Sequence, residues 1–306
     1  MLLRLALLPC AAMQVGLNLP VMVPGLDRAR ILEWSRRIDR GPFSSLAAGE
    51  RITFPNPEIL VTLSAAAAVT ERVKLALTVL VLPLHATALV AKQIATLDVV
   101  SGGRVVLGVG AGARREDYAA AERDFDIAKL ARLEAQVGDL RRIWAGEQRV
   151  PGALRPVEPF PVQRGGPEIL AGSLSEKSIR RAARWADGIA GFSFGPSMAE
   201  IGAAFEHARK AWQQSGRAAP RLVTSFWYAL GANARAQLDE YLRRYLNFMG
   251  AGVAENLLPL VTITSATALR DALRSLRDLG ADEVIPVPTT LDPDEVDRVA
   301  EIVAGL

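Results

Sequence analysis

Short apolar runs of strand length alternate with amphipathic helical patterns along the whole chain of 306 residues. Such alternation predicts a parallel sheet, because parallel strands are joined by crossover helices. Eight units favour a closed (β/α)8 TIM barrel over an open doubly wound sheet. We expect strands over 14–21, 43–47, 73–83, 104–109, 168–171, 188–194, 221–230 and 283–287, and helices over 26–40, 57–70, 86–100, 125–145, 175–187, 197–215, 233–248, 265–279 and 293–304.

Two stretches, 146–167 and 249–264, show no clear periodicity. Irregular segments longer than about 12–15 residues are uncommon in compact domains unless they are functional. The chemistry of a barrel of this kind lies at the carboxyl ends of its strands. We therefore expect these stretches to be insertions or lids at the C-terminal face, and the functional residues to follow the strands.

The counts of cysteine and histidine exclude several kinds of site. The chain has one cysteine, Cys10, and two histidines, His85 and His207. It therefore has no intramolecular disulfide, no CxxC pair and no three-histidine zinc site, and we expect no metal. An enzyme with this composition would take its chemistry from a bound organic cofactor. The formal net charge of +3 and the absence of a basic cluster argue against a nucleic-acid partner.

The first twelve residues weakly resemble a signal peptide, with one arginine and an apolar run. Met13 stands directly before the first predicted strand and could serve as the start of the chain. We interpret residues 1–12 as an N-terminal extension and residues 13–306 as one barrel domain, with export as the alternative. No apolar run reaches the roughly 18 residues of a membrane span, so we predict no membrane partner and a cytoplasmic protein.

Two glycine motifs allow more than one interpretation. Gly108-Val-Gly-Ala-Gly112 follows a strand, but Ala113 stands where a dinucleotide fingerprint needs its third glycine. A tight turn that lets backbone approach a flat ligand is the better interpretation. Gly191-Phe-Ser-Phe-Gly195 matches a hydrolase nucleophile elbow. The only later histidine is His207, on the helix that follows Ser193, so a serine hydrolase remains a remote alternative.

The segment Ala171-Gly-Ser-Leu-Ser175 joins a strand to a helix through small residues. Free backbone N–H groups at a helix start suit a phosphate, although Ser173 or Ser175 could equally be an ordinary N-cap. His85, at the end of the third strand, could be functional or structural.

Residues 62–112 contain T-E-R, an apolar strand running into Pro-Leu, and A-K-Q-I-A-T-L-D-V-V-S-G-G-R before the glycine turn. Together with residues 167–188 (PEILAGS…RAARWADG), this pattern resembles the bacterial luciferase-like monooxygenase superfamily. The resemblance implies a (β/α)8 barrel that binds FMN, or the deazaflavin F420, at the carboxyl ends of its strands. It also implies a bulge in the third strand, sometimes with a non-proline cis peptide, behind the cofactor ring.

For this chain, the resemblance implies cofactor contacts from four of the predicted strands or the turns that follow them. We assign the residues Leu77, Thr78, Val79, Gly110, Ala111, Gly112, Tyr118, Gly172, Ser173 and Phe192 to the cofactor. We assign Ser44, His85 and Phe194 to the substrate side of the pocket.

The chain departs from the acid–base pattern of related F420-dependent sugar-phosphate dehydrogenases at residues 44–50 and at Ala113. No catalytic side chain is therefore named. We expect an oxidoreductase or monooxygenase that uses reduced FMN on a small organic substrate. We expect a separate flavin reductase as its partner, and we expect the chain to form a homodimer. An F420-dependent reductase and a non-catalytic flavin-binding barrel are the alternatives.

Overall fold

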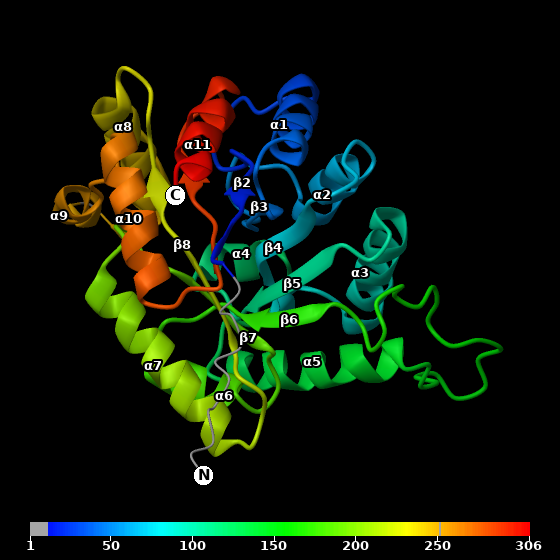
Figure 1. Ribbon diagram of the computed structural model, residues 1–306. Coiled ribbons are helices and arrows are strands. Elements are labelled where there is room, and N and C mark those ends of the chain that lie inside the picture. The colour runs from blue at the N-terminus through cyan, green and yellow to red at the C-terminus, as the bar shows by residue number, and fades with distance from the viewer. Residues whose placement is uncertain (1–11, 251) are drawn as a thin grey trace, which may run out of the picture.

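The computed structural model describes residues 12–250 and 252–306 as a parallel barrel surrounded by helices (Figure 1). The strands are β1 (Gln14–Val15), β2 (Leu17–Asn18), β3 (Ser45–Ala48), β4 (Lys74–Val81), β5 (Val105–Gly110), β6 (Glu168–Ala171), β7 (Gly188–Phe192), β8 (Arg221–Ser225), β9 (Trp227–Tyr228), β10 (Glu283–Val284) and β11 (Val287–Pro288). The α-helices are α1 (Arg28–Arg40), α2 (Ile59–Ala67), α3 (Thr87–Ser101), α4 (Arg115–Ala120), α5 (Lys129–Trp144), α6 (Glu176–Ala182), α7 (Met198–Gln214), α8 (Ala234–Leu246), α9 (Val253–Leu257), α10 (Ala266–Asp278) and α11 (Asp294–Ala304). Short 3₁₀ helices are η1 (Leu82–Leu84), η2 (Asn247–Met249) and η3 (Leu258–Leu260).

The sheet closes on itself through its first strand. Its order is β1-β10-β8-β7-β6-β5-β4-β3-β2, and every pairing is parallel. The two outer members, β1 and β2, are halves of one strand interrupted at Gly16, whose N–H donates to the carbonyl of Val284 at 2.9 Å. The predicted (β/α)8 barrel is confirmed. Three of the eight predicted strands are divided by a short break, which gives β1/β2, β8/β9 and β10/β11.

Two apolar layers follow from the alternation of side chains along each strand. Leu75 and Leu77 of β4 belong to the large core between strands and helices, whereas Ala76 faces the other way. The barrel interior holds a small apolar cluster of Ala47, Ala76, Val106, Leu170, Val223 and Ile285. This layer separates the two ends of the barrel.

The two irregular segments lie at opposite ends of the barrel. Residues 249–264, together with α8, form an insertion between β9 and α10 at the C-terminal face, as predicted. Residues 146–167 were predicted at the same face, and this placement is wrong. Gln163 bonds to Asp98 near the end of α3 and to the carbonyl of Val105 at the start of β5. The segment therefore lies beside α3 at the amino ends of the strands (Figure 1).

Residues 1–11 of the predicted extension lie outside the described residues. Among the residues that the structure describes, no helix has the length and apolarity needed to cross a membrane.

Candidate active site at the carboxyl ends of the strands

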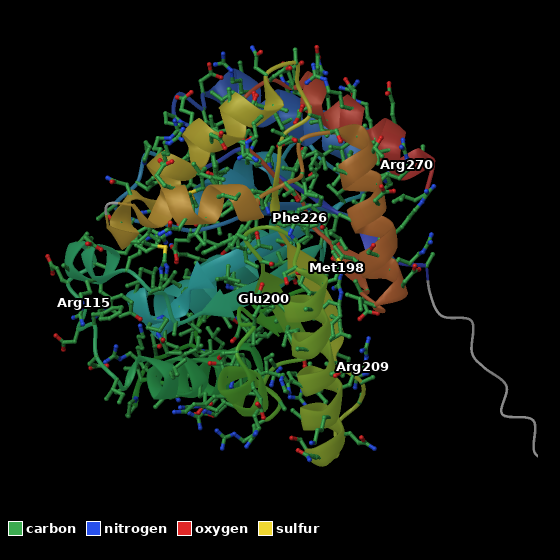
Figure 2. The ribbon with its side chains drawn as sticks, turned by 90° about the vertical axis from the view of Figure 1, so that its left-hand side faces the viewer. Arg115, Met198, Glu200, Arg209, Phe226 and Arg270 are labelled. Carbon is green, nitrogen blue, oxygen red and sulfur yellow. The ribbon has the colours of Figure 1, made fainter. Side chains whose placement is uncertain are left out.

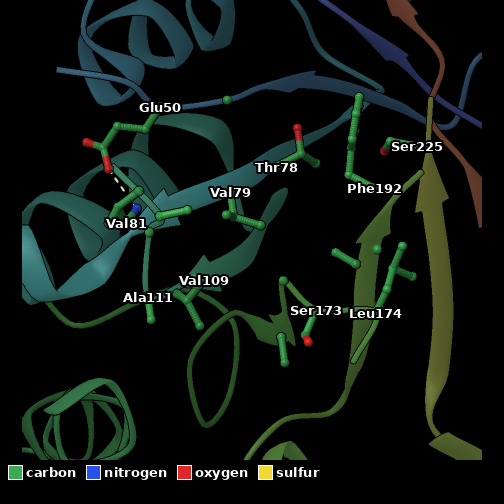
Figure 3. Close-up of a pocket in the computed structure, with 18 of the residues that line it drawn as sticks. Glu50, Thr78, Val79, Val81, Val109, Ala111, Ser173, Leu174, Phe192 and Ser225 are labelled. Carbon is green, nitrogen blue, oxygen red and sulfur yellow. Dashed lines mark hydrogen bonds between the residues drawn. The ribbon is translucent and has the colours of Figure 1, made fainter. Parts of the chain in front are cut away.

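A cavity of about 620 Å³ lies at the carboxyl ends of the strands (Figure 3). Each of the eight strand positions contributes lining residues, from Asn18 at the end of β2 to Pro288 at the end of β11. The volume falls within the range typical of cofactor and small-molecule sites. The prediction that the site follows the strands therefore agrees with the position of this cavity.

A bulge in β4 forms one wall of the cavity. Leu77 pairs with Leu107 of β5, but Leu80 pairs with Val109, so β4 carries one extra residue. The bulge contains Thr78 and Val79, which are joined by a cis peptide bond. The predicted bulge near Leu77–Val79 is confirmed.

The glycines of β5 and β6 make room for this bulge. A Cβ at Gly110 or at Gly172 would lie 2.9 Å from a methyl group of Val79. A Cβ at Gly108 would lie 2.2 Å from the carbonyl oxygen of Leu77. Only glycine tolerates these approaches, so the glycine-rich stretch accommodates the neighbouring strand. The predicted approach of this backbone to a flat ligand stays a prediction.

Gly112 and Tyr118 fix the turn that follows β5. Gly112 has a φ of +68°, and a Cβ there would also lie 2.6 Å from Val81. The Tyr118 hydroxyl donates to the carbonyl of Ala111 at 2.6 Å. Burial raises the pKa of Tyr118, so this hydroxyl stays protonated and keeps donating. Tyr118 packs behind the turn with Val81 and Leu84 and does not line the cavity.

The turn after β6 combines an N-cap with an opening into the cavity. The Ser175 hydroxyl accepts from the Ser178 N–H at 3.4 Å, so Ser175 is the N-cap of α6. The Ser173 hydroxyl accepts from the Ser175 N–H at 3.2 Å. Ser173, Ser178 and Arg181 line the cavity together. Arg181 donates through Nε and Nη2 to Glu134, which also lines the cavity, so the turn offers mainly its serine hydroxyls to a ligand.

A buried carboxylate lies on the opposite wall. The Glu50 side chain, 2% exposed, accepts from the Val81 N–H at 2.7 Å through Oε2, as Figure 3 shows. Its Oε1 lies 2.9 Å from Nε2 of His85. Glu50 lines the cavity, whereas His85 supports it from behind. This pair can hold or accept a proton at the cavity wall.

Aromatic side chains close the remaining side. The Trp227 ring lies 4.6 Å from Phe192, 5.3 Å from Phe194 and 5.0 Å from Tyr245, centroid to centroid. Tyr241 and Tyr245 come from α8, so the insertion between β9 and α10 contributes directly to the cavity. Burial raises the pKa of Tyr241 well above its usual value, so its hydroxyl stays neutral.

Comparison with known proteins agrees with this geometry. The sequence profile of the luciferase-like monooxygenases matches residues 13–296. The chain belongs to this family. It is 28% identical to the 4-hydroxyprotoasukamycin monooxygenase of Streptomyces nodosus subsp. asukaensis, over 88% of this chain and 76% of that protein.

Solved structures show the same fold. The monooxygenase RslO1 of Streptomyces bottropensis matches with a TM-score of 0.77 at 21% identity, over 96% of this chain and 98% of that chain. An F420-dependent secondary alcohol dehydrogenase, described with an F420–acetone adduct, matches with a TM-score of 0.78 at 14% identity, over 96% and 98%. The oxygenating component of 3,6-diketocamphane monooxygenase of Pseudomonas putida, in complex with FMN, matches with a TM-score of 0.72 at 18% identity, over 95% and 96%.

The predicted luciferase-like oxidoreductase is thus confirmed at the level of the family, and the cavity gathers most of its predicted site residues. The lining contains Thr78, Val79, Gly110, Ala111, Gly112, Gly172, Ser173 and Phe192. Four other predicted site residues lie behind this lining: Leu77, Tyr118, His85 and Phe194. Their roles toward a ligand stay predictions.

Ser44 does not belong to this luciferase-like cavity. Its hydroxyl donates to Glu283 Oε1 at 2.5 Å, just before β3 begins. Glu283 begins β10, so this contact lies at the amino ends of the strands, below the apolar cluster inside the barrel. Ser44 precedes β3, and only the carboxyl end of that strand reaches the cavity. The substrate contact assigned to Ser44 has no support from this position.

The hydrolase alternative also fails in the structure. The buried Ser193 hydroxyl donates to Glu200 Oε2 at 2.7 Å or to the carbonyl of Gly195 at 2.9 Å. It also accepts from the Ser197 N–H at 3.3 Å, so it orders the start of α7. His207 lies near Glu176, at 3.9 Å, rather than near this serine. Figure 2 shows Glu200 on the first turn of α7.

Sequence reasoning missed Glu50 and the aromatic residues of α8. Glu50 could have been found, because it is the first carboxylate after the second strand. Tyr241 and Tyr245 are four residues apart on a predicted helix and so lie on one face of it. Such a pattern is typical of ordinary core residues and gave no signal of a site.

Proposed function

We propose that this chain is a monooxygenase that uses reduced FMN, supplied by a separate flavin reductase, on a small organic substrate. The observation that carries the proposal is the arrangement around Val79. Its side chain stands between Gly110 and Gly172, so the cavity wall there is a valine side chain flanked by glycine backbone, against which a flat ring can pack. We assign the phosphate of FMN to the Gly172–Ser173 turn beside it, where the hydroxyls of Ser173 and Ser178 line the cavity. The Gly172 and Ser173 N–H groups already donate to Val109 and Ala171, so these hydroxyls are the donors that the turn offers.

The bound cofactor would supply two-electron transfer to oxygen and substrate. Thr78, Val79 and the Gly110–Gly112 turn would hold and orient its ring, since all of them line the cavity. Phe192 and Trp227 line the cavity as an apolar wall that excludes water. Glu50, held by Val81 and His85, is the group that can take up or return a proton.

An F420-dependent reductase is the second candidate. It is favoured by the TM-score of 0.78 to an F420-dependent dehydrogenase, which is a likeness of fold only. The sequence relative that covers 88% of this chain is a monooxygenase, and this supports the FMN proposal more strongly. We further propose a cytoplasmic homodimer with residues 1–12 as an extension of the barrel domain.

The test is a parallel titration of the purified protein with FMN and F420, following the fluorescence of each ring. We expect micromolar or tighter binding of FMN, and oxygen uptake in the presence of a flavin reductase. Binding of F420 alone would replace the proposal by the second candidate. Binding of neither would remove the cofactor assignment.

Ser173→Asp supplies the matched variant for the phosphate assignment. A carboxylate there would repel a phosphate, so we expect at least tenfold weaker FMN binding, or about 1.4 kcal/mol. Ser265→Asp is the control, because Ser265 caps α10 outside the cavity and aspartate is an equally good N-cap. Equal affinities in the two variants would refute the phosphate assignment.

A further inference from the structure

A buried arginine lies beside the mouth of the cavity without an acidic partner among the described residues. Arg51, in the loop after β3, is 6% exposed. Its guanidinium carbon stands 3.8 Å from the centre of the Phe54 ring, and one N–H reaches the carbonyl of Tyr245 at 3.4 Å. Its Nε is buried and bonds to none of the described residues. Aromatic faces and one long hydrogen bond are therefore its main stabilising contacts.

A second arginine shares the same aromatic rings. The Arg114 guanidinium lies 4.1 Å from the Phe248 ring and 5.2 Å from the Tyr245 ring, and Arg51 lies 5.4 Å and 5.1 Å from the same two rings. The Nε of Arg114 is also buried without a partner in the described part of the chain. Burial, and then the charge of Arg114, lower the pKa of Arg51. The two cations thus repel each other across Tyr245 and Phe248.

The nearby carboxylate is already used. Asp117 Oδ1 accepts from the Thr53 N–H at 2.7 Å, from its hydroxyl at 2.6 Å and from the Ile52 N–H at 3.1 Å. It thereby holds the loop that carries Arg51 instead of forming an ion pair with it. The carbonyl end of α8 offers Arg51 only partial negative charge.

A buried cation beside a half-buried one, with no anion between them, is costly, because an unpaired buried charge loses much of its solvation. Arg114 and Tyr245 both line the cavity, and Arg51 lies behind the Tyr245 ring, so an anion bound against Arg114 within the cavity would lie beside both cations. Guanidinium groups bind planar carboxylates through paired hydrogen bonds, and Arg51 and Arg114 both retain free donors. The adjoining walls, which include Trp227 and Tyr241, are apolar and aromatic.

We propose that Arg51 and Arg114 bind the carboxylate of the substrate, which is an organic acid with an apolar body. This inference rests on the proposed function only in naming the bound acid as the substrate. The pair draws its residues from the loops after β3 and β5, whereas the phosphate turn follows β6. Substrate carboxylate and cofactor phosphate therefore have separate anchors.

The test compares 2-naphthoate with the neutral 2-naphthylmethanol by calorimetric titration, with and without saturating FMN. We expect the wild-type protein to bind the acid at least tenfold more tightly than the alcohol. Arg114→Gln and Arg51→Met should each remove this preference by weakening acid binding at least tenfold, with alcohol binding unchanged. Arg270→Gln is the charge control, because Arg270 lies on α10 across the molecule from Arg115, the neighbour of Arg114 (Figure 2).

Thermal unfolding separates a binding role from a structural one. If Arg51 is kept for a ligand, Arg51→Met removes an unpaired buried charge and leaves the melting temperature of the free protein unchanged or higher. A preference for the acid that persists in both variants would overturn the proposal. So would variants that weaken FMN binding instead, because the pair would then serve the cofactor. Failure of FMN to bind at all would refute the proposed function, while the acid–alcohol comparison would still decide this inference.

Discussion

At the scale of single residues, the shape of the cavity wall depends on two glycines, which have no side chain. Gly110 and Gly172 leave the space that Val79 fills, and neither tolerates a Cβ at 2.9 Å from a valine methyl group. The glycine pattern was readable in the sequence as a close approach of backbone. The atom that approaches was not readable, because it belongs to a bulge on another strand.

This packing predicts compensation between Gly110 and Val79. Gly110→Ala should destabilise the protein by about 1–3 kcal/mol and weaken cofactor binding, because the added methyl group overpacks the wall. Val79→Ala in the same chain should restore most of both losses, since it removes the valine methyl group that the added Cβ would meet. Urea unfolding and FMN titration of the two single variants and the double variant measure this coupling. Strictly additive losses would show that the two residues do not compete for one space.

Glu50 is the residue whose role the sequence left open. Glu50→Gln should lower turnover at least tenfold while leaving cofactor affinity within a factor of two, because an amide keeps the hydrogen bond from Val81 but cannot accept a proton. Glu240→Gln, on the exposed side of α8, is the control. Unchanged turnover in Glu50→Gln would assign the Glu50–His85 pair to structure alone.

At the scale of elements, the sequence predicted the existence of each segment more accurately than the end of the barrel at which the segment lies. Residues 146–167 follow a helix and precede a strand, and in a βα barrel such a connection lies at the amino ends of the strands. We predicted this segment at the C-terminal face because long irregular loops are usually functional, and this prediction ignored the order of helix and strand on either side of it. Residues 249–264 also follow a helix, but that helix, α8, is itself part of an insertion between β9 and α10.

The attachment of α11 is predicted to depend on pH. Glu295 Oε1 accepts from the Leu230 N–H at 2.8 Å, and its Oε2 pairs with Arg298 at 2.9 Å. Burial raises the pKa of Glu295, although both contacts oppose the shift. The folded chain therefore holds this proton more tightly than the unfolded chain. Stability from Glu295 is complete below its ordinary pKa and is lost as the pH rises through the folded value.

Urea unfolding of the wild type and Glu295→Gln between roughly pH 4 and pH 7 tests this direction, since one pKa unit corresponds to about 1.4 kcal/mol. Relative to the variant, the wild type should become less stable as the pH rises. Glu301→Gln, exposed on the same helix, should follow the wild type. A wild type that gains stability on the variant with rising pH would contradict the raised pKa.

At the scale of the whole molecule, the barrel separates a stabilising end from a binding end. Local patterns predict the order of strands and helices, because each depends on near neighbours in the chain. The site joins distant positions, such as Arg51 with Tyr245 at a separation of 194 residues. No local pattern encodes such contacts, so the motif-level resemblance indicated the glycine-lined wall of the cavity, while the cluster of Arg51, Arg114, Tyr245 and Phe248 was not predicted.

We predict that a substitution at the amino end of the barrel lowers the stability of the protein without weakening the binding of FMN. Glu283, nearly inaccessible to solvent, accepts from Ser45 at 2.7 Å and from Arg221 at 2.6 Å. Glu283→Leu leaves these donors buried and should cost about 3–5 kcal/mol in the free energy of unfolding. FMN affinity, measured where the variant is still folded, should stay within a factor of two. Replacing both partners, as Glu283→Leu with Arg221→Leu, should recover much of the stability, because an apolar pair leaves fewer unsatisfied charges. A folded Glu283→Leu variant with much weaker FMN binding would show instead that the two ends of the barrel are coupled through the apolar layer between them.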